Sequence, residues 1–498
     1  MSSYTGLGAL IELEKTPSIT NPAAVVRKDK QGIASTPSDH ELDQMQWGKP
    51  MKGPTVTVQG AHTPLTPSEL ESSNPSTPTG KGAVDLVQSI FNPPRNKWRL
   101  LSVCFINFAN GLNDSAPGAL IPYIEKDYNI GYAIVSLIFV TNAIGFIIAA
   151  PFTHALESKL GRSRCFILSL SLLATAYVII ICKPPFPAIV ASFFLLGFGM
   201  AINLALGNVF CANLSNSTAA LGGMHGSYGI GGVIGPLVAT AIASHGVRWS
   251  FYYVLNLATA LFNLVFSAWA FKGYEKESSV RLITALQKTA SRQETTEEEE
   301  GTSKKGLLKQ AVKSKVTLLG ALFIFAYQGA EVSTSGWVVS FLISYRKGDP
   351  SKVGYVSAGF WAGITLGRFL LSHPAQRIGR KLAVVVLVAG SVAFQLMTWL
   401  IPNVIGEAVT VAILGLLLGP IYPCATAVFS SLLPRNIQMS SLSFISAMGS
   451  SGGAVAPFLT GLLAQRAGTF VLHPICIGLY GVMVVGWVCL PRLPKRSE

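Results

Sequence analysis

Long apolar segments separated by polar links fill the chain from residue 98 onward. A helix needs roughly 20 apolar residues to cross a bilayer, and twelve segments approach that length. Several links are short, which forces neighbouring helices to run antiparallel. The predicted spans are Trp98–Ile124, Tyr132–Phe152, Cys165–Cys182, Ala188–Phe210, Leu221–Ala243, Trp249–Phe271, Val316–Ile343, Val353–Leu371, Leu382–Ile401, Val404–Leu432, Leu442–Ala464 and Phe470–Leu490.

The spans form an internal repeat. The segment Phe108–Ser115 returns loosely as Ala326–Ser333, 218 positions later, and the same offset carries Gly161-Arg162 onto Gly379-Arg380. A repeat of this length, made of apolar segments, indicates two membrane bundles in tandem. We therefore predict an all-α membrane protein with twelve transmembrane helices in two six-helix pseudo-symmetric bundles.

Polar stretches set the domain boundaries. The N-terminal stretch is rich in Ser, Thr, Pro and Gly, so it is expected to be disordered. A second polar stretch separates the sixth and seventh spans. The expected parts are a cytoplasmic tail (1–96), an N-terminal bundle (97–272), a cytoplasmic central loop (273–314), a C-terminal bundle (315–491) and a short cytoplasmic tail (492–498).

Composition and charge agree with a membrane protein. Only 12% of the residues are charged and mean hydropathy is +0.46, whereas soluble domains carry about 25% charged residues. The net charge of +14 comes from bases beside apolar segments, which is typical of membrane orientation and argues against nucleic-acid binding. The positive-inside rule puts both termini in the cytoplasm. We expect a multi-pass protein of the plasma membrane, with a monomer as the favoured form.

The sequence offers no basis for a metal or a nucleotide cofactor. The seven cysteines are scattered without a C-x-x-C pair, and no G-x-x-x-x-G-K-[ST] loop is present. Energy from ATP is therefore not expected. An ion gradient, most simply of protons, or downhill flow remains.

The first span carries a polar face. Asn107, Asn110 and Asp114 recur at helical spacing, next to Asn113. Such a face must look into the bundle or a water-filled cavity, so these residues are candidates for solute and proton binding. The alternative is a polar cluster that ties helices together. Pro117-Gly118 predicts a weakened helix just beyond.

The seventh span repeats this chemistry. Tyr327, Gln328 and Glu331 fall within four residues and are followed by Trp337. Glu331 is the candidate proton carrier of the second half, and the other three suit contacts with a polar solute. The alternative for Glu331 is a structural pair with Arg368.

Four other features could carry function. Arg368 lies inside the eighth span, where it could form a gating ion pair or snorkel to the surface. His225 could titrate near neutral pH or pack helices. Asn203 is the polar candidate of the fourth span. The glycine-rich segments Gly231–Pro236 and Gly452–Pro457 are expected to let helices pack closely and the halves rock.

These residues resemble a known family. Twelve spans, a long central loop, and Gly161-Arg162 with Gly379-Arg380 after the second and eighth spans are similar to the major facilitator superfamily. Gly111–Asp114, Gly329–Ser333 and Gly367-Arg368 resemble its fucose–proton symporter branch, above all the fungal bypass-of-stop-codon type.

The resemblance implies alternating access, a solute site between the halves and gating by the two Gly-Arg motifs. Two positions depart from the family pattern. Ser158 stands where the loop-two signature has an acidic residue, with Glu157 beside it, and Asn203 stands where the fucose type has a carboxylate in helix four. The inner charge lock and the carbohydrate preference therefore do not transfer directly.

We predict a secondary active transporter for a small organic solute, a sugar-like compound or a secondary metabolite, coupled to protons and without a cofactor. Export of a fungal metabolite or toxin is one alternative. A nutrient receptor built on a transporter fold is another. The sequence shows no pair of catalytic residues at the membrane surface, near the ends of the predicted spans. An enzyme is therefore not expected.

Overall fold

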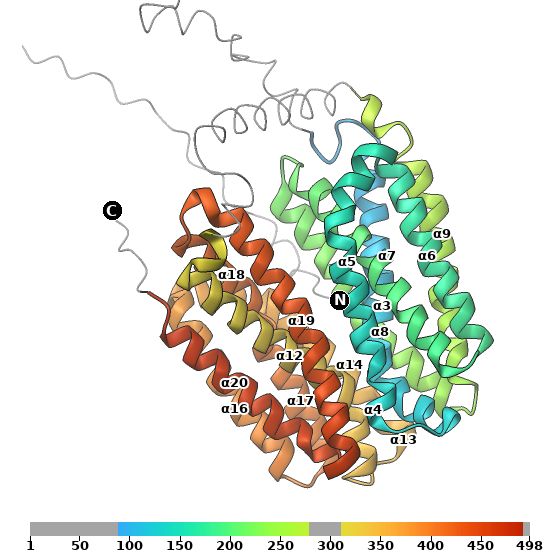
Figure 1. The fold of residues 1–498 in the computed structure, drawn as a ribbon, viewed down its shortest axis with the longest axis vertical. Coiled ribbons are helices and arrows are strands. Elements are labelled where there is room, and N and C mark those ends of the chain that lie inside the picture. Colours follow the sequence, from blue (N-terminus) through green and yellow to red (C-terminus); the bar gives the residue numbers. More distant parts are fainter. Residues whose placement is uncertain (1–87, 278–309, 492–498) are drawn as a thin grey trace, which may run out of the picture. The chain divides into compact units, whose positions relative to one another are not determined.

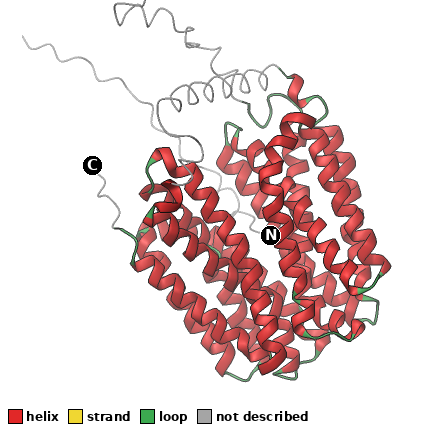
Figure 2. Ribbon diagram, in the orientation of Figure 1, coloured by secondary structure: helices red, strands yellow, loops and turns green. Residues whose placement is uncertain are grey.

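The computed structural model describes residues 88–277 and 310–491, and these residues are helical, without a β-strand (Figure 2). Contacts divide the chain into Met1–Pro75 and a compact unit, Ser76–Glu498, that holds all the elements below. Most of the expected N-terminal tail, much of the central loop and the C-terminal tail lie outside the described residues.

The first bundle contains six membrane spans. Its elements are α3 (Asn96–Tyr128), α4 (Tyr132–Val135), α5 (Leu137–Leu160), α6 (Arg162–Cys182), α7 (Phe186–Ala212), α8 (Ser217–Ser244), η2 (Trp249–Phe251), α9 (Tyr252–Ala270) and η3 (Tyr274–Lys276). The pieces α4 and α5 together make the second span. Turns at residues 88–95 precede α3 and are bonded to it.

The second bundle repeats the arrangement (Figure 1). Its elements are α12 (Lys315–Ser344), α13 (Pro350–Val353), α14 (Tyr355–Leu370), α15 (Ser372–Ile378), α16 (Arg380–Leu400), α17 (Val404–Leu418), α18 (Ile421–Leu432), α19 (Arg435–Ala467), η4 (Thr469–Val471) and α20 (Leu472–Val488). The tenth span breaks between α17 and α18 at Gly419-Pro420. Pro420, which has no backbone N–H to donate, accounts for this break.

The predicted fold class is confirmed. Ten segments of the described chain are long and apolar enough to cross a membrane. The helices α3 and α14 take the places of the first and eighth spans, so the arrangement is consistent with twelve. The polar face of α3 and the 16-residue length of α14 explain why simple hydropathy separates them from the other ten.

One expectation about α3 is wrong. Pro117 and Pro122 lie inside an unbroken helix of 33 residues, so Pro117-Gly118 does not end it. Gly118 serves a different purpose, because a Cβ there would lie 2.0 Å from the carbonyl oxygen of Ser335 in α12. The glycine lets the two bundles touch backbone to backbone.

Close helix pairs give each bundle its frame. A Cβ on Gly231 of α8 would lie 2.0 Å from the carbonyl oxygen of Phe108 in α3, and a Cβ on Gly452 of α19 would lie 2.0 Å from that of Phe325 in α12. These glycines occupy the matching repeats, so the same small-residue packing joins the first and fifth spans and the seventh and eleventh.

The two bundles meet at one end, called here the α4 end, which is formed by α4, α13 and the C-terminal ends of α3 and α12 (Figure 1). A Cβ on Gly461 would meet Trp337 and Tyr132, and one on Gly354 would meet Thr240. At the opposite end, which carries Gly161-Arg162 and Gly379-Arg380, no hydrogen bond or ion pair joins the bundles among the described residues. The bundles are therefore closed together at the α4 end.

Candidate functional site

Asp114 lies half-buried on α3 and is bonded to another helix of its own bundle. Its Oδ2 accepts a hydrogen bond of 2.9 Å from the hydroxyl of Tyr228 on α8. The close approach of α3 and α8 at Gly111, whose Cβ would lie 2.1 Å from the carbonyl oxygen of Tyr228, brings the two side chains together. Asp114 therefore does not face lipid.

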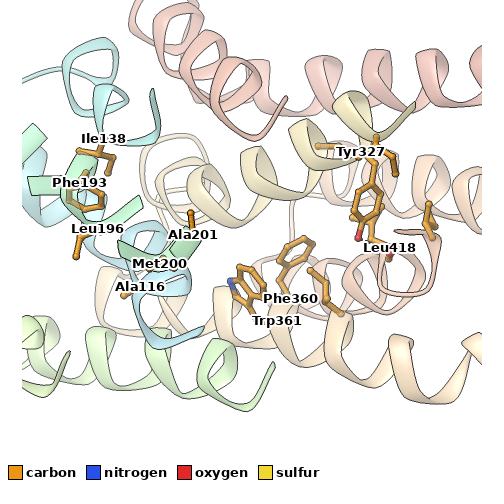
Figure 3. Close-up of a cluster of buried hydrophobic side chains, with 14 of the residues drawn as sticks. Ala116, Ile138, Phe193, Leu196, Met200, Ala201, Tyr327, Phe360, Trp361 and Leu418 are labelled. Atoms are coloured by element: carbon orange, nitrogen blue, oxygen red, sulfur yellow. Dashed lines mark hydrogen bonds between the residues drawn. The ribbon is translucent and has the colours of Figure 1, made fainter. Parts of the chain in front are cut away.

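Tyr228 links this pair to the second bundle. Its ring meets Trp361 of α14 edge to face, with ring centroids 6.1 Å apart, and Trp361 also covers Gly232 of α8. Trp361 is 5% exposed, and its Nε1 is buried without a hydrogen-bond acceptor among the described residues. Figure 3 places Trp361 beside Phe360. An unpaired indole donor thus lies where the two bundles face each other.

In the second bundle, the acidic residue Glu331 forms an ion pair with Arg368. Glu331 Oε1 lies 3.9 Å from Arg368 Nη2, at the limit of an ion pair. Glu331 is 5% exposed, and its Oε2 has no partner among the described residues, whereas the Arg368 side chain is 32% exposed. A loosely paired carboxylate with a free oxygen can bind a proton or a donor group.

Tyr327 and Gln328 have different surroundings from each other. The Tyr327 hydroxyl donates to the carbonyl oxygen of Leu418, the last residue of α17, so it satisfies the backbone at the break of the tenth span (Figure 3). Gln328 is half-buried against the glycines of α19, with its Oε1 3.8 Å from where a Cβ on Gly453 would lie. Of the two, Gln328 keeps the freer side chain.

The asparagine candidates point into the first bundle. Asn110 is 4% exposed, and Asn113 is 2% exposed with its Nδ2 donating to Met200 Sδ of α7 at 3.2 Å. Asn203 of α7 is fully buried and accepts a hydrogen bond from Ser169 of α6. The contacts of Asn113 and Asn203 tie helices of one bundle together, which was the structural alternative for this polar cluster.

Trp337 lies at the α4 end. It is 1% exposed, its Nε1 donates to the carbonyl oxygen of Pro457, and its ring meets Tyr132 of the first bundle at 5.7 Å. It lies six residues beyond Glu331, or about 9 Å along the helix. The structure thus places Trp337 in the contact that closes the bundles.

His225 is exposed on α8, one turn before Tyr228. It lies two turns inside the helix, because α8 begins at Ser217, four residues before the predicted start of the fifth span at Leu221. The adjacent Gly226 faces Phe369 of α14, where a Cβ would lie 3.1 Å from the ring. His225 is therefore near the α8–α14 contact without touching Asp114 through a hydrogen bond.

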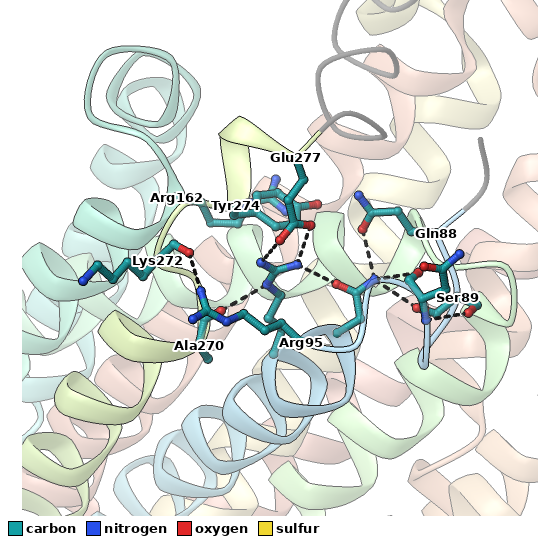
Figure 4. A network of polar contacts seen from close by, with 11 residues as sticks. Gln88, Ser89, Arg95, Arg162, Ala270, Lys272, Tyr274 and Glu277 are labelled. Carbon is teal, nitrogen blue, oxygen red and sulfur yellow. Dashed lines mark hydrogen bonds and ion pairs between the residues drawn. The ribbon is translucent and has the colours of Figure 1, made fainter. Parts of the chain in front are cut away.

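The first Gly-Arg motif forms a charge lock at the end of its bundle opposite the α4 end, where Figure 4 shows Arg162 beside Tyr274. Arg162 pairs with Glu157 through Nε and Nη2, and its backbone N–H donates to Glu275 at 2.6 Å. The guanidinium stacks over Tyr274 at 4.9 Å. Gly161 has a φ of +80°, which favours glycine, and packs against Glu275.

An acid–arginine pair of the kind that the resemblance implied is therefore present, with the acid one position earlier in the chain. Glu157 takes the part expected of position 158, where Ser158 instead donates to the carbonyl oxygen of Ala155. The second motif differs, because Gly379 has open space around it and Arg380 is exposed without an ion pair to any described residue. The two halves are not equivalent at this end.

Three residues at these sites escaped the sequence reasoning. Tyr228 and Trp361 were not singled out from the sequence, and Glu157 was noted without a partner. Their signal was weak, since 114 positions separate Tyr228 from Asp114. No group of three or more His, Cys, Asp or Glu that could hold a metal occurs in the described part of the chain.

Comparisons with known proteins agree with this fold. The sequence profile of the Major Facilitator Superfamily matches residues 103–406 and 333–498. Bypass of stop codon protein 6 of Saccharomyces cerevisiae is 25% identical over 414 residues, which cover 79% of this chain and 83% of that protein.

Two further likenesses are more distant. A glucose/galactose transporter of Brucella abortus is 30% identical over 189 residues, covering 33% of this chain and 42% of that protein. The crystal structure of a D-xylose-proton symporter superposes with a TM-score of 0.64, covering 80% of this chain and 99% of that one. Its sequence identity is 13%, so this likeness shows the fold alone.

Proposed function

Because this chain belongs to the major facilitator superfamily, we propose that it couples the movement of a polar organic solute to protons by rocking its two bundles about a shared site. Membership of this family shows that the chain is a multi-pass membrane transporter. The identity of the solute, the coupling to protons and the direction of transport are the parts that we propose. The single observation that carries it is that each half of the repeat has a carboxylate at a nearly matching position. Asp114 bonds to Tyr228 at the contact between the bundles, and Glu331 pairs loosely with Arg368.

The chemistry of the site suits a solute with several hydroxyl groups. Asp114 and Glu331 Oε2 offer acceptors, while Trp361 Nε1 and the part-exposed Arg368 offer donors. Gln328 adds an amide that can do both. A hydroxyl group of the solute can donate a hydrogen bond to the carboxylates and accept one from the indole or the guanidinium group.

Asp114 and Glu331 are the proposed proton carriers. A carboxylate deep in a membrane protein is costly while charged, which favours uptake of a proton when its partner moves away. Arg368 would neutralise Glu331 in one step and release it in another, since the two are within reach without a close hydrogen bond. No bound cofactor is needed, because the proton gradient supplies the energy.

Orientation follows the charge pattern. The end with Gly161-Arg162 would face the cytoplasm together with both termini, so the α4 end would face outward. The conformation described here would then be closed to the outside. Residence in the plasma membrane and a monomeric state complete the proposal.

The test measures proton movement in liposomes. Purified protein would be screened against sugars and other polar metabolites by thermal shift, because a ligand of the folded state raises the unfolding temperature. The best ligand would then be added to proteoliposomes that contain a pH dye. Wild type should acidify the lumen on solute entry, and Asp114→Asn and Glu331→Gln should reduce the proton signal at least tenfold.

Asp127→Asn is the matched control. Asp127 lies on the same helix as Asp114 but pairs with Lys183 and Trp249 at the outer surface, so its loss should leave coupling unchanged. Unaltered proton flux in both test variants would refute the coupling. Imposing the gradient in each direction distinguishes import from export of a metabolite, and deletion of residues 1–90 separates a carrier, which keeps its flux, from a receptor.

A further inference from the structure

A cationic patch marks the end of the seam between α3 and α9, called here the α3–α9 seam. Arg95, Lys97 and Lys272 are exposed there. Arg95 Nη1 donates to the carbonyl oxygen of Lys272 at 2.9 Å, which holds two of the three bases together. None of the three forms an ion pair with a carboxylate in the described part of the chain.

The nearby acids already have partners. Glu277 (Figure 4) forms a bidentate ion pair with Arg99, which is fully buried. Glu275 accepts a hydrogen bond from the backbone N–H of Arg162. These carboxylates are used to hold the end of α9 against α3 and α6. Among the described residues, no carboxylate therefore remains to pair with the three surface bases, and an anion such as a phosphate could bind them.

Two exposed indoles border the patch. Trp98 and Trp269 meet edge to face at 6.0 Å and are 41% and 46% exposed. Lys97 lies over the Trp98 ring at 5.6 Å, and Arg95 over the Trp269 ring at 6.0 Å. Exposed Trp next to bases is typical of the headgroup level of a membrane, so the patch lies where lipid phosphates lie.

An apolar pocket continues along the same seam. Its volume is about 300 Å³. Phe105 lies seven residues beyond Trp98 on α3, or roughly 10 Å deeper in the membrane. Phe105 and Phe262 are 39% and 53% exposed, so the pocket opens toward the lipid. Its lining consists of Phe105, Phe108, Ala258, Thr259, Phe262 and Asn263.

We propose that the α3–α9 seam binds one anionic phospholipid, with its phosphate on Arg95, Lys97 and Lys272 and an acyl chain in the aromatic pocket. The order of cations, indoles and apolar pocket along the seam matches the order of headgroup, interface and chain in a lipid. A soluble phosphate would use only the first part. The predicted orientation puts this end in the cytoplasmic leaflet, where anionic lipids concentrate.

The location gives the lipid a structural consequence. The patch joins the start of α3, the helix that carries Asp114, to the residues that follow α9 and lead toward the second bundle. The phosphate of a bound lipid lowers the repulsion among the three bases at this junction. Its occupancy should therefore stabilise the first bundle.

Native mass spectrometry can test the proposal. Full-length protein would be exchanged into equal amounts of phosphatidylserine and phosphatidylcholine of the same chain length, and the retained lipid counted. Wild type should retain one phosphatidylserine selectively. Each base contributes about fivefold at a membrane surface, so the triple variant Arg95→Gln, Lys97→Gln, Lys272→Gln should lose the selectivity.

The matched control removes two exposed bases elsewhere at the same end, through Arg377→Gln and Arg380→Gln, and should keep wild-type selectivity. Ala258→Phe fills the pocket and should lower retention at least fivefold while the bases remain. Quenching of Trp98 by brominated acyl chains reports the seam independently, and it should weaken in a Trp98→Phe variant.

Three results would overturn the proposal. They are equal retention of the two lipids by wild type, unchanged selectivity in the triple variant, and displacement of the lipid by millimolar glycerol phosphate, which would point to a site for a soluble phosphate. Unfolding curves recorded in lipid-free detergent check that each variant is folded. The readout counts lipid directly, so it does not depend on the transport proposal.

Discussion

Tyr228 donates a hydrogen bond of 2.9 Å to Asp114 Oδ2 and at the same time packs its ring against Trp361 of the other bundle. One side chain therefore touches both the acidic residue of α3 and the surface along which the bundles face each other. Movement of α14 relative to α8 would change the surroundings of the Asp114 carboxylate.

Tyr228→Phe should reduce solute-coupled proton flux while the fold is retained. The substitution keeps the ring and removes a hydrogen bond to a charged group, worth about 1.5–3 kcal/mol, which corresponds to roughly 10-fold or more in rate or affinity. Tyr252→Phe is the control, because its hydroxyl also donates to α3, at Leu112, without reaching Asp114. Equal losses in the two variants, measured in proteoliposomes, would show that Asp114 is not the relevant acceptor.

Trp361→Phe should weaken solute binding by about fivefold or more. The phenyl ring preserves most of the packing on Gly232, whereas the unpaired Nε1 donor is lost, and a hydrogen bond contributes about 1 kcal/mol or more. Trp337→Phe removes an indole donor that is already bonded to Pro457, so it should lower the unfolding temperature and leave affinity alone. Isothermal titration with the solute separates the two, and unchanged affinity in Trp361→Phe would remove this residue from the site.

Gly118→Ala should open the α4 end. The new methyl group would lie 2.0 Å from the carbonyl oxygen of Ser335, which must withdraw before an ordinary contact of 3.4 Å is reached. Spin labels on the exposed His245 and Lys352, one on each bundle, should report a longer distance. Gly222→Ala is the control, because nothing lies within 4 Å of its Cβ. An unchanged distance distribution in Gly118→Ala would mean that the bundles do not separate here.

Glu157→Gln should destabilise the first bundle, whereas Ser158→Ala should not. Arg162 is 6% exposed and loses its charged partner, and a fully buried pair broken this way costs about 3–5 kcal/mol. The Glu157 side chain is 25% exposed, so solvent lowers the expected cost to about 1–3 kcal/mol. Ser158 is exposed and should change stability by less than about 0.5 kcal/mol. Denaturant unfolding of both variants decides whether position 157 carries the lock.

The pattern of apolar segments predicted the spans well, because each must bury its backbone in helical hydrogen bonds within lipid. The pattern was less informative about proline and glycine inside a span, because these residues can either interrupt a helix or allow a close contact with a neighbouring helix. Pro117-Gly118 was expected to weaken the helix just beyond, yet α3 continues to Tyr128 and Gly118 allows close contact with Ser335. In the tenth span, Gly419-Pro420 does interrupt the helix, and Tyr327 satisfies a carbonyl freed there.

The candidate site was harder to predict. Polar spacing found Asp114 and Glu331, since charge in an apolar span is rare and costly. The spacing of polar residues could not distinguish an asparagine that binds solute from one that forms a hydrogen bond between two helices. Asn113 and Asn203 have the same sequence signature as a binding residue, but their amides are used between helices of one bundle.

The sequence by itself determined the membrane class, the tandem repeat and the two acidic positions, because hydropathy and periodicity are local properties of the chain. Only the tertiary structure decided that Tyr228 bonds to Asp114, that Glu157 pairs with Arg162, and that Trp337 closes the α4 end. These pairings depend on which helix faces are turned toward each other. That choice arises from packing between distant segments, and no single segment encodes it.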